Sequence, residues 1–524
     1  MLAAILGSSM VFLDGSVVNL ALPRIGATLP ASLVSTLEGQ TYVVSAYLAT
    51  LAALLVLAGA LADYHGRRRV FAIGLAGFGL TSVMCGLAPS LELLVLFRIL
   101  QGAAGALLVP APLAILTALF DGPARARAIG IWAAATSAAI LVGPVVGGLL
   151  VDTVDWRAAF LVNVPLVLLA LYATLRYIAE TRAEHATGRF DWLGAAVVAM
   201  AVGGLSFGAI RGQDREWADP VAWIALGVGA CALLAFPVLM ARRRHPLVPL
   251  GLFRRRAFAT VNLSTLLIYG ALYTALTFQA LFLQGVLGYS ATAAGVVTLP
   301  QGVFLTLLST RIGSLAGRYG PRPFLVAGPM LMAAGVGWLA RMPASSEAWR
   351  LSWSVPATFS PPPSAIVDLG PYVLLFSLGL SLLVAPLTTA LMASVPVANA
   401  GVASAINNAI SRVGQPIISA VIFVAVTGSF YAALAGAIPG LDPASPALRD
   451  LVQPLNPPRP GAPAQVVEAA RVASASAFHA AALVCAALLA AGAAANWLGL
   501  REGGPAAVRA TTHADPSTTD ADAG

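Results

Sequence analysis

The chain has 524 residues, of which 59% are hydrophobic and only 10% are charged. Soluble proteins carry about 25% charged residues, so this composition indicates an integral membrane protein with little soluble mass. The net charge of +8 does not indicate nucleic-acid binding, because the basic residues fall in short loops and not on one face. Three scattered cysteines offer neither a metal-binding spacing nor a disulfide framework, so we expect no metal and no cofactor.

Apolar segments of helical length recur along the chain, and fourteen of them are long enough to cross a bilayer. β-Strands are not expected, because the strands of membrane barrels are short and alternate in polarity. The predicted all-α transmembrane segments are 2–22, 41–61, 70–88, 92–119, 127–151, 158–178, 192–211, 221–241, 258–284, 292–313, 324–341, 370–393, 402–428 and 477–499.

The placement of arginine predicts the orientation of these segments. Seventeen arginines fall in the loops after even-numbered segments and in the tail, against nine on the other side. Positively charged loops remain in the cytoplasm. We therefore expect a multi-pass protein of the cytoplasmic membrane with both termini in the cytoplasm.

Asp14 is the one acidic residue that lies deep inside a predicted segment. It is about eight residues, or about 12 Å, from the end of its helix. A lone carboxylate in hydrocarbon is costly unless it faces a cavity, pairs with a cation or holds a proton. A role in helix packing is the alternative interpretation.

A second polar group lies in FRILQGAAGALLVP (97–110), where Arg98, Gln101, Gly102 and Gly105 share one helix face. Arg98 is about 10 Å deep, measured from the same side of the membrane as Asp14. We expect the two side chains to meet or to share a water-filled cavity, so that protonation of Asp14 releases Arg98. A static buried ion pair is the alternative.

An internal repeat divides the chain, because GALADYHGRRR (59–69) and GSLAGRYGPRP (313–323) share Gly, Leu, Ala, Gly and Arg at matching offsets. Transporters are often built from two related bundles with the substrate site between them. We expect four regions: an N-terminal six-helix bundle (1–180), two extra transmembrane helices with a basic cytoplasmic connector (181–257), a C-terminal six-helix bundle (258–500) and a disordered cytoplasmic tail (501–524). The connector sets the topology or, alternatively, contacts lipid head groups.

Two Pro-rich extracellular loops are expected in the C-terminal bundle, at 342–369 and 428–476. They either cap the outer vestibule or are ordinary variable loops.

The first copy of the repeat has the features of a gating loop. Its glycine allows a tight turn, and its aspartate can face a helix N-terminus across the bundle interface. A simple positive-inside loop would explain the arginines but not the glycine and the aspartate. The residues assigned to gating are Gly59, Asp63, Gly66, Arg67 and Arg68.

The stretch AAILVGPVVGG (138–148) combines small residues four apart with a proline that can bend a helix. It serves either tight packing alone or a bent interface that prevents leakage. The residues that carry these two features are Gly143, Pro144, Gly147 and Gly148.

Taken together, these motifs resemble the major facilitator superfamily, and within it the fourteen-helix drug:proton antiporter branch, the EmrB/QacA-like transporters. FLDGSVVNLALP (12–23) is similar to the first-helix signature of that branch, and FRILQGAAGA to its fourth-helix arginine motif. LVGPVVGG resembles the antiporter motif, with Ala139 in place of the leading glycine. WRAAFLVNVPL (156–166) and ASAINNAISRVGQP (403–416) also match.

The resemblance implies the major facilitator fold, with two six-helix bundles plus two extra helices. It implies proton-coupled export of lipophilic small molecules or drugs by alternating access, and hence multidrug efflux and antibiotic resistance. The residues expected to serve proton coupling or substrate binding are Asp14, Asn19, Arg98, Gln101, Asn408 and Arg412.

The substrate is less defined than the fold. With one deep acid and two deep arginines, a monocation, a neutral lipophile or an anion fits better than a dication. Arg412 either contacts substrate or satisfies neighbouring amides. A dedicated exporter of one endogenous metabolite, anionic or lipid-like, is the alternative function.

The alternative from a different functional class is an enzyme or a membrane sensor. The five histidines are scattered and pair with nothing evident, and no Walker loop is present. We therefore expect a non-enzymatic transporter that acts as a monomer. Its expected partners are a small-molecule substrate, protons and membrane lipids, and no nucleic acid.

Overall fold

The computed structural model describes residues 1–120, 122–180, 191–215, 217–243, 250–352, 354–395 and 400–500. These residues form helices joined by short loops, and the described ranges contain no strand. The long helices are α1 (Leu2–Thr28), α2 (Thr36–His65), α3 (Arg67–Gly86), α4 (Leu91–Leu108), α6 (Gly122–Thr153), α8 (Asn163–Tyr177), α9 (Trp192–Asp214), α10 (Pro220–Arg242), α11 (Arg256–Leu281), α12 (Ala291–Tyr319), α13 (Arg322–Leu339), α14 (Pro363–Ala393), α15 (Ala400–Ala437) and α17 (Ala464–Gly499). The short ones are α5 (Ala111–Leu119), α7 (Ala158–Leu161), α16 (Pro446–Leu451), η1 (Leu250–Arg254), η2 (Phe282–Val286) and η3 (Pro356–Phe359).

Every predicted apolar segment coincides with helix. Within the described residues, twelve helices are long and apolar enough to cross a membrane, and α2 and α6 cover the other two predicted segments. The chain is thus a multi-pass, all-helical membrane protein.

Two predicted segments are interrupted, each next to a proline. The segment 92–119 breaks into α4 and α5 at Val109–Pro110, and the segment 158–178 breaks into α7 and α8 at Val162. Proline lacks an N–H and crowds the carbonyl four residues earlier. For Pro165 that carbonyl belongs to Leu161, the last residue of α7.

The two predicted extracellular loops are shorter than expected. Helix α14 begins at Pro363, inside the loop expected at 342–369. Helix α15 continues to Ala437 and α17 begins at Ala464, so that both enter the loop expected at 428–476. The stretches that extend α15 and α17 are rich in alanine, the best helix former, and can stay helical beyond the bilayer.

Side-chain caps fix several helix starts. Ser35 and Glu38 form a reciprocal capping box at the start of α2, and Ser290 accepts a hydrogen bond from the Ala293 amide at the start of α12. The Asp219 carboxylate accepts from the Val221 amide at the start of α10, and this bond, with Arg211 beside it, lowers the pKa of Asp219. Polar residues in the loops therefore define where the apolar helices begin.

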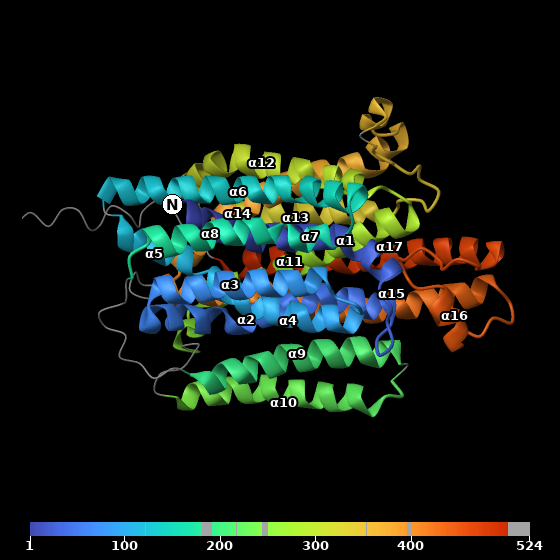
Figure 1. Ribbon diagram of the computed structural model, residues 1–524, viewed down its shortest axis with the longest axis horizontal. Helices are drawn as coiled ribbons and strands as arrows, with labels where there is room; N and C mark the ends of the chain where they lie inside the picture. The colour runs from blue at the N-terminus through green and yellow to red at the C-terminus, as the bar shows by residue number, and fades with distance from the viewer. Residues whose placement is uncertain are drawn as a thin grey trace, which may run out of the picture.

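The long helices run roughly alongside one another in one elongated bundle (Figure 1). We call α1–α8 the N-terminal half and α11–α17 the C-terminal half. The halves meet where α6 packs on α12 and α2 packs on α15. Helices α9 and α10 lie side by side along one edge of the bundle, with α9 against α2 and α15 (Figure 1).

The two ends of the bundle differ. The end with the α2–α3 loop carries Arg67, Arg68 and Arg69, and we call it the basic end; the other we call the opposite end. Hydrogen bonds join the two halves at the opposite end. There the Asp152 carboxylate, near the end of α6, accepts from the Thr292 amide of α12 at 2.7 Å.

A second link at the opposite end is a reciprocal amide pair. Gln40 Nε2 donates to Asn456 Oδ1 at 2.8 Å, and Asn456 Nδ2 donates back to Gln40 Oε1 at 2.9 Å. Gln40 belongs to α2 and is fully buried, whereas Asn456 lies in the loop between α16 and α17. This part of the loop therefore closes onto the N-terminal half.

The two copies of the internal repeat share one local geometry. Gly66 and Gly320 end α2 and α12 at φ values of 106° and 83°, in a region that favours glycine. Arg68 donates from Nη2 to the Leu175 carbonyl near the end of α8, and Arg322 donates to the Trp497 carbonyl near the end of α17. The repeat seen in the sequence is therefore also a structural repeat.

Candidate ion-pair site in the N-terminal half

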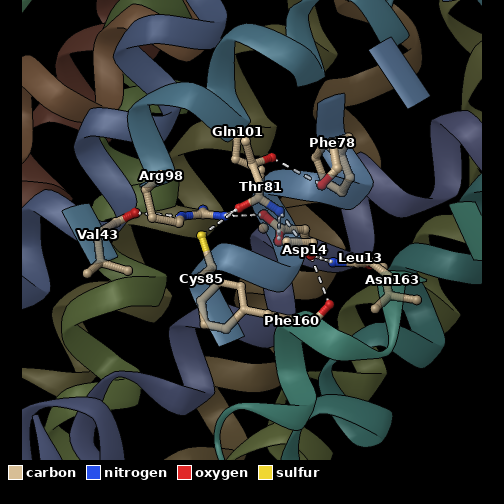
Figure 2. Close-up of polar contacts among 12 residues, drawn as sticks. Leu13, Asp14, Val43, Phe78, Thr81, Cys85, Arg98, Gln101, Phe160 and Asn163 are labelled. Carbon is tan, nitrogen blue, oxygen red and sulfur yellow. Dashed lines mark hydrogen bonds and ion pairs between the residues drawn. The ribbon is translucent and has the colours of Figure 1, made fainter. Parts of the chain in front are cut away.

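The deepest charges of the N-terminal half form one ion pair (Figure 2). Arg98 Nη1 of α4 lies 2.6 Å from Asp14 Oδ2 of α1, and the two side chains are 1% and 0% exposed. The expectation that these residues meet is confirmed. The pair is closed off from solvent, so each charge depends on its protein neighbours.

Arg98 has further contacts, which involve no carboxylate and include the Phe160 ring, whose centre lies 5.8 Å from the guanidinium carbon. Its Nε donates to the main-chain carbonyl of Val43 at 2.9 Å, and its Nη1 also donates to Gln101 Oε1 at 2.8 Å. Its guanidinium carbon lies 4.0 Å from the centre of the Tyr47 ring. These contacts would keep the guanidinium in place if Asp14 became neutral.

The second oxygen of Asp14 faces two amide donors. Gln101 Nε2 lies 3.3 Å from Asp14 Oδ1, and Asn163 Nδ2 of α8 lies 3.5 Å from the same atom. Both amides also donate to Ser82 Oγ of α3, and Ser82 in turn donates to the Phe160 carbonyl at 2.9 Å. Helices α1, α3, α4 and α8 thus share one buried polar network (Figure 2).

The hydrogen bonds of this network depend on the charge of Asp14. An ionised Asp14 accepts hydrogen bonds from a guanidinium and two amides, whereas a protonated Asp14 loses the charge that pairs with Arg98. Breaking a buried ion pair on one side typically costs about 3–5 kcal/mol. The ion pair therefore contributes to how α1 packs on α4.

Asn19 lies outside the network. Its Nδ2 donates to the Gly15 carbonyl of its own helix at 3.0 Å, and its Oδ1 accepts from Thr277 Oγ1 of α11 at 2.9 Å. The residue therefore links the two halves of the molecule and does not contact Asp14.

The predicted polar face of α15 is divided. Arg412 is 8% exposed and its guanidinium carbon lies 5.9 Å from the centre of the Phe12 ring of α1, two residues before Asp14. Asn408 is exposed, whereas its neighbour Asn407 donates to Asn262 and Thr265 of α11. Arg412 thus comes near the helix that carries Asp14.

The loop motif is held by an acid that the sequence analysis missed. The Arg68 and Arg69 amides at the start of α3 donate to the two carboxylate oxygens of Glu180, at 3.0 and 3.2 Å. Glu180 follows α8, so this contact stays within the N-terminal half. A Cβ added at Gly66 would lie 2.4 Å from the same carboxylate, which explains why glycine stands there.

The other gating residues lie on either side of this turn. Gly59 faces α5, where an added Cβ would lie 3.9 Å from Pro110. Arg67 is half-buried at the first position of α3. Asp63 lies within α2, and its side chain is outside the described residues.

The antiporter-type motif lies on α6 between the halves. A Cβ added at Gly143 or Gly147 would meet Ser16 or Val17 of α1, at 2.5 and 2.8 Å. A Cβ added at Gly148 would lie 2.5 Å from the Ala291 carbonyl of α12, and Pro144 is inside the helix between them. The small residues therefore let α6 touch the first half on one face and the second half on another.

A protein-family model described as the Major Facilitator Superfamily matches residues 4–419. The chain belongs to the Major Facilitator Superfamily.

Curated relatives of this superfamily member are similar over most of their length. It is 35% identical to the multidrug resistance protein Stp of Mycobacterium tuberculosis over 83% of this chain and 75% of that protein. It is 32% identical to the tetracenomycin C resistance and export protein of Streptomyces glaucescens, over 81% and 75% of the two chains. It is 34% identical to the puromycin resistance protein pur8 of Streptomyces alboniger, over 81% of each. The chain is thus a superfamily transporter and not an enzyme.

Solved structures of other superfamily members share the fold. A bacterial homologue of the human lysosomal transporter Spinster, in an inward-facing conformation, has a TM-score of 0.60 at 18% identity over 95% of both chains. The xylose transporter XylE of E. coli, in an inward-open conformation, has a TM-score of 0.55 at 14% identity over 96% of both. At these identities the likeness concerns the fold alone.

Sequence reasoning missed the Tyr47, Ser82 and Asn163 side chains in this superfamily site. Asn163 had a signal, because it is the only amide in the segment 158–178 and lies in the motif WRAAFLVNVPL. Tyr47 and Ser82 had none, since an aromatic residue or a serine in an apolar helix is common.

Proposed function

We propose that this protein exports lipophilic small molecules across the cytoplasmic membrane in exchange for protons, by alternating access. The buried ion pair between Asp14 and Arg98 carries this proposal. A titratable acid at membrane depth is costly and typically serves proton or substrate movement. The printed names of the relatives, which describe resistance to drugs and antibiotics, support the substrate class.

Proton loading of Asp14 is the step that couples the two movements. The neutral acid no longer balances Arg98, and α1 is free to shift against α4 while Val43, Gln101 and Tyr47 hold the guanidinium. Loss of the proton on the other side of the membrane restores the pair. The cycle thus converts a proton gradient into a change in how α1 packs.

The surroundings of Asp14 disfavour a substrate that carries two positive charges. Arg412 faces Phe12 on α1, so the space between the halves holds a second cation beside the one deep acid. A monocation, a neutral lipophile or an anion is consistent with this balance. Gating through Gly59, Asp63, Gly66, Arg67 and Arg68, and packing through the α6 motif, complete the proposed cycle.

The proposed architecture has fourteen spans, with both termini in the cytoplasm. It comprises an N-terminal bundle (1–180), two extra helices with a connector (181–257), a C-terminal bundle (258–500) and a tail (501–524), and acts as a monomer. The surplus of arginine at the basic end supports this orientation. Hydrogen bonds that close the opposite end, such as Gln40–Asn456, support an inward-facing state.

The test is dye transport into inverted membrane vesicles with an imposed pH gradient. We expect gradient-driven uptake by the unaltered protein and none by Asp14→Asn or Arg98→Ala. The matched control is Glu468→Gln, which removes an exposed carboxylate paired with Arg471 and should transport normally. Equal membrane levels of all variants are established first by quantitative blotting.

Two results would contradict the proposal. Uptake that survives Asp14→Asn would place proton coupling on another group. Absence of uptake for every lipophilic monocation, neutral dye and anion tested would favour the dedicated exporter of one endogenous metabolite.

A further inference from the structure

A cavity of about 560 Å³ lies outside the interface of the two halves, between α2, α4 and the helix pair α9–α10. It reaches along α2 from Tyr42 to Leu54, and its far wall is formed by residues of α9 such as Ala199 and Gly203. This volume is typical of a small-molecule site, and the lining is largely apolar. In Figure 1 the pair α9–α10 lies along one edge of the bundle, with α9 on the side of the other helices.

We propose that this cavity binds one acyl chain of a membrane glycerophospholipid. The stretch of α2 from Tyr42 to Leu54 rises about 18 Å. Half of a hydrocarbon core of about 30 Å is about 15 Å. The cavity therefore has the depth of a single leaflet, which suits a chain that enters from the head-group level.

Polar side chains lie at the levels expected for the phosphate and the ester carbonyl of such a lipid. Arg211 lines the cavity near the opposite end, and the exposed Arg215 lies one helical turn further along the chain. Both donate to the Leu33 carbonyl, at 2.7 and 3.1 Å. Guanidinium groups at that level are suited to a phosphate.

Three acids with described side chains near this end, Glu38, Glu92 and Asp219, already have partners within the protein. Glu92 Oε1 accepts from the Ser32 and Leu33 amides, and Asp219 Oδ2 accepts from Arg211. Glu38 is fully buried, 4.0 Å from Arg211. None of these carboxylates needs to face the phosphate.

Ser206 provides an observation independent of charge. It lines the cavity, is 5% exposed, and its hydroxyl has no hydrogen-bond partner among the described residues. A buried hydroxyl without a partner is costly, and a ligand oxygen would satisfy it. Ser206 is five residues before Arg211, or about 7.5 Å deeper, where the ester carbonyl follows the phosphate in a glycerophospholipid.

Photolabelling of the full-length protein in nanodiscs tests this assignment. The probe is phosphatidylglycerol with a diazirine in its acyl chain, and labelled peptides are mapped by mass spectrometry. We expect labelling of α2 between Tyr42 and Leu54 and of α9 between Ala199 and Phe207.

Two glycines on the extra helices supply matched variants. A Cβ added at Gly203, which lines the cavity, or at Gly227, which faces outward on α10, meets no atom within 4 Å. Gly203→Phe should fill the cavity and reduce labelling of these peptides at least fivefold, whereas Gly227→Phe should leave it unchanged. Ser206→Ala, which removes one hydrogen bond, should reduce labelling about two- to tenfold.

Three outcomes would overturn the proposal. Equal labelling in Gly203→Phe and Gly227→Phe would mean annular lipid only. Unchanged labelling in Ser206→Ala would remove the hydroxyl from the site. Loss of the label on addition of a transported dye would identify the cavity as a substrate site. Transport assays on the same variants test the export function separately from lipid binding.

Discussion

Each half of the molecule buries a polar cluster on its first and fourth long helices, and the two clusters differ in charge. In the N-terminal half α1 and α4 hold the Asp14–Arg98 ion pair. In the C-terminal half the Tyr372 hydroxyl of α14 donates to Gln279 Oε1 of α11 and accepts from Gln301 Nε2 of α12. All three of these neutral side chains are less than 10% exposed.

The difference shows how one architecture can separate two tasks. A neutral cluster fixes helix positions at any pH, because its members do not change charge in the physiological range. A cluster with a carboxylate does the same only while that group is ionised. This contrast fits the proposal that protons act on the N-terminal half and not on the C-terminal half.

The largest expected effect comes from removing the cation. Arg98→Leu leaves a buried carboxylate without its partner, and we expect the free energy of unfolding to fall by about 3–5 kcal/mol. The double variant Asp14→Asn/Arg98→Leu should recover most of that stability but no proton-driven transport. Thermal unfolding in detergent, followed by size-exclusion chromatography, measures the stability of both variants, and the vesicle uptake assay measures their transport. Equal stability of the single variant and the unaltered protein would refute the paired state.

A substitution in the neutral cluster of the C-terminal half should lower the free energy of unfolding by a smaller amount, and the loss should not depend on pH. Tyr372→Phe leaves Gln279 and Gln301 without their shared hydroxyl, which should cost about 1–3 kcal/mol. Transport should keep the same pH profile as the unaltered protein. A shifted profile would mean that the C-terminal half takes part in proton coupling and would remove the contrast between the halves.

Removing one amide donor from the cluster in each half tests the comparison between the halves further. Asn163→Ala removes one hydrogen-bond donor from Asp14 Oδ1 and so weakens the buried network around the ion pair. We expect proton-driven flux to fall about two- to tenfold and its half-maximal pH to rise by less than about one unit. Gln301→Ala, which removes a donor from Tyr372, is the matched control and should leave that pH unchanged. A profile that moves equally in both variants would contradict this account.

The smallest effect is expected at the loop. Glu180→Gln weakens the anion at the N-terminus of α3, which should cost about 0.3–1 kcal/mol and only while salt is low. Thermal unfolding at low and high salt measures this term. A loss that persists at high salt would mean that Glu180 acts through its packing on Gly66 and not through its charge.

The helices were predictable because apolar length is a property of each segment alone. The breaks at Pro110 and Pro165 also had a signal in the sequence, since proline inside an apolar run predicts an interruption. The extensions of α15 and α17 were not predictable, because an alanine-rich helix can continue past the membrane surface and hydropathy does not record it.

The ion pair was predictable because depth along two helices can be counted from a common side. Rotation about the helix axis explains what was missed. Asn19 follows Asp14 by five residues, which turns it by about 140°, and so it faces Thr277 of α11. Tyr47 and Ser82 join the site through the packing angles of α2 and α3, which no pattern within one segment reveals.

The amide pair between Gln40 and Asn456 must separate when the opposite end opens. Neither amide titrates, and a contact between neutral groups is not screened by ions. When the pair separates, water can replace each hydrogen bond at little net cost. Separation of this pair should therefore be indifferent to ionic strength and to acidity, in contrast to the Asp152–Thr292 contact at the same end, whose acceptor is a carboxylate.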